Sequence, residues 1–126
     1  MASPREFTIY VVVADDAVRD SLYVLLGSFG FATCPFSSAA AFRQDYRPVQ
    51  KSCLVIDEDL AETSGFELLE ELRSDGVRVP AILMTQRLNA TIQAASEGIG
   101  AMLLEKPCTP DKLIGCLKKI FGRGKS

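Results

Sequence analysis

Five short runs of β-branched and apolar residues alternate along the chain with five segments that have the periodicity of a helix. The runs are nearly continuous in apolar residues, which is typical of strands buried on both faces of a parallel sheet. Strict alternation of this kind predicts a parallel sheet with helices on both faces. Right-handed crossovers then favour the common doubly wound (βα)5 arrangement, a five-stranded sheet with the strand order 2-1-3-4-5.

The boundaries of these elements follow from breaks in the apolar pattern. The expected strands are 8–14, 31–36, 53–57, 80–85 and 101–104. A residue that can cap a helix precedes each expected helix: Asp16, Ser38, Ser64, Asn89 and Thr109. The fourth helix has a thin apolar face, so we expect it to pack less firmly than the others. A chain of 126 residues suits one domain, and we expect a single domain over 1–126 with its core at about 8–121.

Composition narrows the possible functions. The net charge of −2 argues against nucleic-acid binding by this domain, because neutralising phosphates requires a basic face. No apolar run is long enough to span a membrane, and no secretory signal is recognisable, so the cytoplasm is the expected location. The chain has no histidine, and its four cysteines form no CxxC pair. Zinc-ligand spacing and chemistry with a histidine base are therefore excluded.

Polar side chains gather where the expected strands end. The first strand is followed by Asp15 and Asp16, the third ends in Asp57, the fourth in Thr85, and the fifth leads into Lys106. In the predicted strand order these ends meet at one edge of the sheet, where ligands bind in such folds. A carboxylate nucleophile with a hydroxyl donor, an ammonium group and acids that can hold Mg²⁺ suits the acceptance of a phosphoryl group. Asp57 is the expected phosphoacceptor.

These motifs in combination resemble the response regulator receiver domain, the CheY-like phosphoacceptor module with a flavodoxin-like fold. The resemblance extends from about Thr8 to Phe121, and its motifs are Cys53–Asp57, Ser64–Gly65, Val79–Pro80 leading into Ile82–Thr85, and Glu105–Pro107. Two further segments, Val18–Leu22 and Pro35–Phe42, resemble the FixJ-type branch of the family. In that branch the receiver usually precedes a DNA-binding domain that regulates transcription.

The resemblance implies a role for each residue. A partner histidine kinase or phosphotransfer protein would phosphorylate Asp57 in a two-component system, with Thr85 and Lys106 as the switch hydroxyl and lysine. Mg²⁺ would be the cofactor, with Asp57 and the backbone carbonyl of Asp59 among its ligands. The peptide bond before Pro107 would be cis.

The same resemblance implies how the signal leaves the domain. The fourth helix, fifth strand and fifth helix would carry it to an output domain or effector outside this chain, and a homodimer is compatible with it. The only activity implied is self-phosphorylation and autodephosphorylation at Asp57, not that of a conventional enzyme.

The chain departs from the family at several positions. Receivers carry two acids at the end of the first strand, and an ungapped comparison places Val13 and Ala14 there. Either the strand end is shifted so that Asp15 or Asp16 reaches the metal, or the Mg²⁺ site is impaired. Leu103 stands where an aromatic switch residue is expected.

Two alternatives to a phosphorylated receiver remain. A pseudo-receiver would bind a protein partner with little or no phosphorylation, and Val13 and Ala14 favour it. An unrelated flavodoxin-like binder or enzyme is the other, but the residues from Ala14 to Val18 include no glycine to cradle a phosphate.

Overall fold

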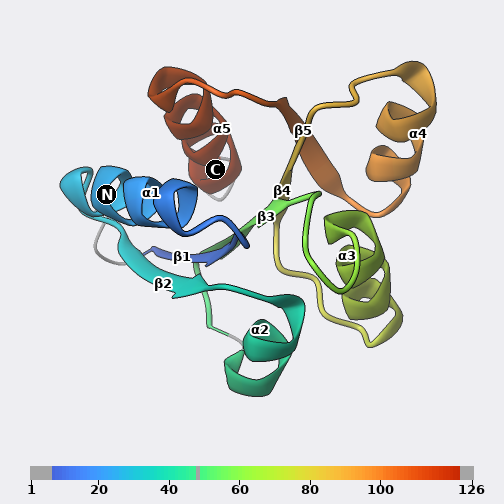
Figure 1. Cartoon of the computed structure of the whole chain (residues 1–126), viewed down its shortest axis with the longest axis horizontal. Helices are drawn as coiled ribbons and strands as arrows, with labels where there is room; N and C mark the ends of the chain where they lie inside the picture. The colour runs from blue at the N-terminus through green and yellow to red at the C-terminus, as the bar shows by residue number, and fades with distance from the viewer. Residues whose placement is uncertain (1–6, 48, 123–126) are drawn as a thin grey trace.

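The protein is a five-stranded parallel sheet covered by helices, seen in a computed structural model that describes residues 7–47 and 49–122. The strands are β1 (Thr8–Val12), β2 (Ala32–Phe36), β3 (Ser52–Asp57), β4 (Ala81–Thr85) and β5 (Ala101–Glu105). The helices are α1 (Asp16–Ser28), α2 (Ala39–Asp45), α3 (Gly65–Ser74), α4 (Ala90–Gly98) and α5 (Pro110–Gly122). The strand order is β2-β1-β3-β4-β5, which confirms the predicted topology (Figure 1).

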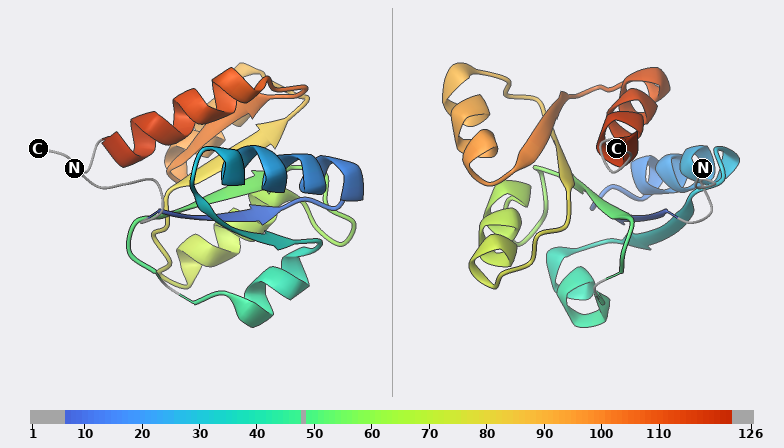
Figure 2. Two further views of the ribbon diagram at one scale, coloured as in Figure 1. Left: turned by 90° about the vertical axis from the view of Figure 1, so that its left-hand side faces the viewer. Right: turned by 180° about the vertical axis from the view of Figure 1, so that it is seen from behind.

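Two apolar cores lie on the two faces of the sheet. Helices α1 and α5 cover one face, and α2 and α3 cover the other, as the two views of Figure 2 show. The central strands β3 and β4 are buried along their whole length, which explains why their sequences are continuous in apolar residues. The strand order reverses between β1 and β3, so the crevice where ligands bind in such folds lies at the carboxyl ends of these two strands.

The end of β1 differs from the expectation. The strand ends at Val12 instead of continuing to Ala14, although the N–H of Val13 still donates to Phe36 O over 3.1 Å. The predicted cap was also wrong by one residue: Asp15, not Asp16, caps α1, because its carboxylate accepts the N–H of Val18. Asp16 is the first residue of the helix. A cap accepts from the second or third helical N–H, and only Asp15 has that spacing.

The two helices that flank β4 differ in how they pack. Helix α3 begins with a complete capping box between Ser64 and Glu67 and buries four residues, Gly65, Leu68, Leu69 and Leu72. In α4 the only buried residue is Ser96, whose hydroxyl has no hydrogen-bond partner in the part of the chain that is described. This is the thin apolar face that the sequence predicts for the fourth helix.

Within residues 7–47 and 49–122, none of the helices combines the length and the hydropathy that a bilayer crossing requires.

Candidate functional site

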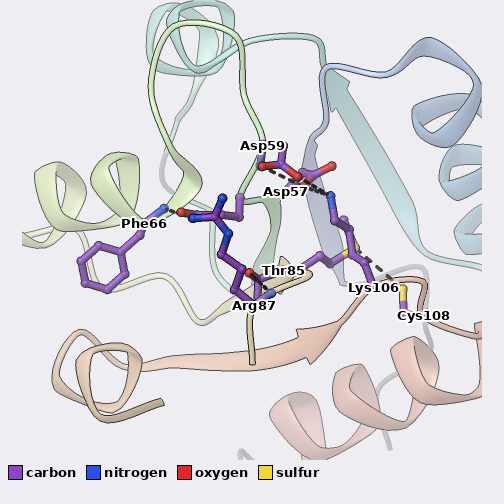
Figure 3. A network of polar contacts seen from close by, with 9 residues as sticks. Asp57, Asp59, Phe66, Thr85, Arg87, Lys106 and Cys108 are labelled. Atoms are coloured by element: carbon purple, nitrogen blue, oxygen red, sulfur yellow. Dashed lines mark hydrogen bonds and ion pairs between the residues drawn. The ribbon is translucent and has the colours of Figure 1, made fainter. Parts of the chain in front are cut away.

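Asp57 is the last residue of β3, and 6% of its surface is exposed. Its Oδ1 accepts two hydrogen bonds, from Lys106 Nζ at 2.7 Å and from the backbone N–H of Asp59 at 3.0 Å (Figure 3). Among the described residues, none donates a hydrogen bond to its Oδ2. One carboxylate oxygen is thus held in place, and the other is free to react.

Lys106 follows β5 and bridges two carboxylates. Its Nζ lies 2.7 Å from Asp57 Oδ1 and 3.0 Å from Asp59 Oδ2. Burial lowers the pKa of this ammonium, but hydrogen bonds and attraction from the two carboxylates outweigh burial, so the pKa is raised. The peptide bond between Lys106 and Pro107 is cis, as the resemblance implies.

Thr85 ends β4 and is 1% exposed. Its Oγ1 accepts the backbone N–H of Arg87 over 3.1 Å, and its backbone carbonyl accepts the N–H of Lys106. A hydroxyl that already accepts a bond still has its own proton to donate. Thr85 therefore presents a hydrogen-bond donor at the same edge of the sheet as Asp57.

The loop from β3 to α3 is held tightly to the sheet. The N–H of Glu58 donates to Met84 O, and its carboxylate accepts the N–H of Phe66 at 2.9 Å. Gly65 makes the closest approach, because a Cβ at this position would lie 2.5 Å from the carbonyl oxygen of Asp57. Only glycine fits here without displacing the backbone that carries the acceptor.

The acids at the start of α1 have partners of their own, although Asp15 also lines the same cleft as Asp57, Asp59 and Lys106. Asp15 caps the helix, and Asp16 pairs with the guanidinium of Arg19 at 2.5 Å. The same guanidinium donates to the carbonyl oxygens of Val13 and Ala14 at the end of β1.

Two clefts meet above the acceptor. One, of about 800 Å³, runs between α1 and α5 and includes Asp57 and Lys106. The other, of about 660 Å³, opens toward α4 and includes Thr85. Ala14, Asp59 and Gln86 line both clefts, so they frame the boundary between them. The residue that the end of β1 contributes to this boundary is Ala14, which has a methyl side chain.

Comparison with known proteins identifies the class. The family model "Response regulator receiver domain" matches residues 9–118. The chain belongs to the response regulator receiver domain family, and receiver domains generally bind Mg²⁺ at an acidic pocket.

Several of the relatives that it matches are named as transcriptional regulatory proteins. The chain is 36% identical over 121 residues to the transcriptional regulatory protein FixJ of Azorhizobium caulinodans, covering 95% of this chain and 57% of that protein. It is 30% identical over 115 residues to the response regulator protein TmoT of Ectopseudomonas mendocina, covering 90% of this chain and 52% of that one. The chain therefore spans little more than half the length of these relatives.

Solved structures agree with this placement. The response regulator StyR superposes with a TM-score of 0.84 at 31% identity, over 92% of this chain and 59% of StyR. Full-length FixJ from B. japonicum superposes with a TM-score of 0.82 at 30% identity, over 94% of this chain and 59% of that chain. The protein is thus a receiver domain that is similar to part of FixJ-like two-component response regulators.

The residues at the site do not fit the Mg²⁺ that the family binds. No group of three acids, cysteines or histidines able to hold a metal ion occurs within 7–47 and 49–122. The carboxylates of Asp57 and Asp59 share the ammonium of Lys106. Magnesium requires several oxygen ligands in octahedral geometry. Ala14 contributes no carboxylate to the clefts, and the carboxylate of Asp15, which lines one of them, accepts the N–H of Val18 as the cap of α1.

Sequence reasoning placed Asp57, Thr85 and Lys106 at this edge, and the structure brings all three there. It assigned only a backbone carbonyl to Asp59, whose carboxylate also binds Lys106. It did not single out Arg87, which lies two residues after Thr85 and lines the same cleft.

Proposed function

We propose that Asp57 accepts a phosphoryl group and that the domain then changes conformation to control an output partner. The observation that carries this proposal is the polarised carboxylate: Lys106 and the N–H of Asp59 hold Oδ1, while Oδ2 is left as the nucleophile. The hydroxyl of Thr85 lies at the same edge as a donor for a phosphoryl oxygen. We take the whole chain as one receiver domain with its core at about 8–121.

The chemistry is an in-line displacement at phosphorus. Oδ2 of Asp57 forms a bond to phosphorus as the bond from phosphorus to the donor breaks, and the leaving group takes the electron pair of that bond. For a phosphohistidine donor, the leaving atom is an imidazole nitrogen. Negative charge spreads over the three outer oxygens, and the ammonium of Lys106, held 2.7 Å from Asp57 Oδ1, stabilises it.

The partners follow from the family. A histidine kinase or phosphotransfer protein would supply the phosphoryl group, in the cytoplasm, and a separate effector or output domain would receive the signal. FixJ and TmoT are named as a transcriptional regulatory protein and a response regulator. Control of transcription is accordingly the output that we propose, without direct nucleic-acid binding by this domain and with a homodimer as one arrangement for it.

A small phosphoryl donor tests the proposal without a known kinase. The protein is incubated with phosphoramidate, with and without Mg²⁺, and intact mass is recorded over time. We expect the mass gain of one phosphoryl group, lost on acid or hydroxylamine treatment, and none in Asp57→Asn. No gain in the wild-type protein under either condition would refute phosphoryl acceptance.

One observation favours a second candidate, a pseudo-receiver that acts only through protein contact. Ala14 occupies the position at the end of β1 that borders both clefts, where the family carries an acid. That candidate predicts binding to a protein partner that Asp57→Asn does not alter.

A further inference from the structure

The charges around Asp57 raise a question that the proposed function leaves open. Transferring a phosphoryl group places dispersed negative charge beside a carboxylate, and a metal ion usually neutralises part of it. Here the acids present do not make a metal site, and Lys106 is already shared between Asp57 and Asp59. A further positive charge must come from the protein itself if transfer is to be efficient.

Arg87 is the cation placed to supply it. Arg87 lines the cleft toward α4 together with Asp59 and Thr85, and it is the only lysine or arginine among the described residues lining that cleft. Its backbone N–H donates to Thr85 Oγ1 at 3.1 Å, which fixes the start of its side chain beside the switch hydroxyl. Figure 3 shows the side chains of Arg87 and Lys106 on opposite sides of the Asp57 and Asp59 carboxylates.

Arg87 shares its cleft with a carboxylate that is held in place. Glu58 lines the same cleft, and its Oε1 accepts the N–H of Phe66 at 2.9 Å. Burial raises the pKa of Glu58, while the Phe66 N–H and the positive charge of Arg87 act in the opposite direction. Arg87 itself is exposed, so its guanidinium can move without disturbing the core. A phosphoryl group on Asp57 would compete with Glu58 for it.

We propose that phosphoryl transfer to Asp57 proceeds without a divalent cation, with Lys106 and Arg87 supplying the positive charge, and that Arg87 exchanges Glu58 for a phosphoryl oxygen. This inference rests on the proposed function. Arginine suits the role because its planar guanidinium binds phosphate oxygens in pairs and stays charged at every physiological pH. The exchange also gives the β4–α4 loop a new partner after phosphorylation, because Arg87 lies between β4 and α4.

The bonds balance without a metal. With phosphoramidate as donor, Oδ2 of Asp57 forms the new P–O bond and the P–N bond breaks. Ammonia leaves with the electron pair of that bond, and its three protons are already on the nitrogen of the zwitterionic donor. Neither a redox partner nor a co-reactant is needed. Lys106 and Arg87 contribute charge and hydrogen bonds only.

The test measures the rate of phosphoryl uptake from phosphoramidate by intact mass, in excess EDTA and in millimolar Mg²⁺. We expect the wild-type rates in the two conditions to agree within about twofold, because no metal step is involved. Arg87→Gln should slow uptake by roughly tenfold or more, and Arg87→Lys by less. Arg78→Gln is the matched control, since Arg78 is an exposed arginine outside both clefts.

A second variant keeps the test decisive if Arg87→Gln folds poorly. Glu58→Gln retains the oxygen that accepts the Phe66 N–H but removes the charge that competes for Arg87. We expect this variant to take up phosphoryl groups several times faster than the wild-type protein, because Arg87 is released from the competing carboxylate. Uptake at the wild-type rate or slower in Glu58→Gln would contradict the exchange.

The other outcomes separate the two proposals. Uptake that requires Mg²⁺, or that is the same in Arg87→Gln and the wild-type protein, overturns this inference and leaves phosphoryl acceptance intact. Absence of uptake in both EDTA and Mg²⁺ refutes the proposed function, and this inference with it.

Discussion

The two halves of the site differ in the chemical groups that they offer. The half built by β3, β4 and β5 has a buried acid, a buried hydroxyl and a lysine. The ammonium of Lys106 lies 2.7 Å from Asp57 Oδ1, and the hydroxyl of Thr85 accepts the N–H of Arg87. The half built by the end of β1 has a buried Val13, a methyl group at Ala14, and acids committed to the start of α1. The groups that would bind a phosphoryl group and those that would bind a metal ion come from different strands. One set can therefore change without the other.

This difference teaches where the positive charge must come from. The negative charge that would develop at a carboxylate acceptor must be balanced by nearby cations, whether they are metal ions or side chains. Where the strand end offers no acid to hold a metal ion, side chains must balance this charge, and Lys106 lies beside Asp57. Four changes test this comparison.

The largest effect is expected from Lys106→Met, which removes the cation that bridges Asp57 and Asp59. Phosphoryl uptake should fall by about a hundredfold or more, the loss that follows removal of one pre-organised group that stabilises developing charge. The rate is measured by intact mass, with Lys112→Met, an exposed lysine on α5, as control. Similar rates in Lys106→Met and Lys112→Met would show that Lys106 does not supply the charge that uptake needs.

Gly65→Ala tests how rigidly the acceptor half is built. The new Cβ would lie 2.5 Å from Asp57 O and 2.6 Å from Ile56 Cγ2, so the free energy of unfolding should fall by about 1–3 kcal/mol. Urea denaturation measures it. Gly115→Ala on α5 is the control: its Cβ would meet nothing within 4 Å, so this variant should be about 0.5–1 kcal/mol more stable.

Ala14→Asp should rebuild part of the other half. A carboxylate at the boundary of the two clefts would join Asp57 and Asp59, and we expect Mg²⁺ to bind roughly tenfold more tightly than to the wild-type protein. Isothermal titration calorimetry measures this affinity. Ala40→Asp, on the exposed face of α2, adds the same charge elsewhere. Equal affinities in the two variants would show that Ala14 does not face the site.

The smallest effect separates capping from metal binding at Asp15. Asp15→Ala should lower the free energy of unfolding by about 1 kcal/mol, whereas Asp15→Asn should change it by only a few tenths, because asparagine also caps helices. Both should take up phosphoryl groups at the wild-type rate. A large loss of uptake in Asp15→Asn with unchanged stability would assign Asp15 to the acceptor chemistry instead.

Much of the fold and the acceptor half could be predicted from the sequence. Continuous apolar runs and the residues that end them specify strands within one or two positions, and parallel strands bring Asp57, Thr85 and Lys106 to one edge whatever the details of packing. The end of β1 was harder, because a one-residue choice between Asp15 and Asp16 as the cap depends on local dihedral angles.

Arg87 and Glu58 were missed for a different reason. They lie on separate loops, after β4 and β3, and both line the cleft toward α4, where the positive charge of Arg87 acts to lower the pKa of Glu58. No periodicity reports such an arrangement, since it arises only when the two loops fold over the same cleft.

The close approach of Gly65 has a mechanical consequence. The first residue of α3 lies so close to the carbonyl of Asp57 that no Cβ fits between them, so we expect α3 to follow β3 as one body. Helix α4 buries only Ser96, so we expect it to yield more easily. A displacement that begins at Asp57 should therefore reach α4 more readily than α3.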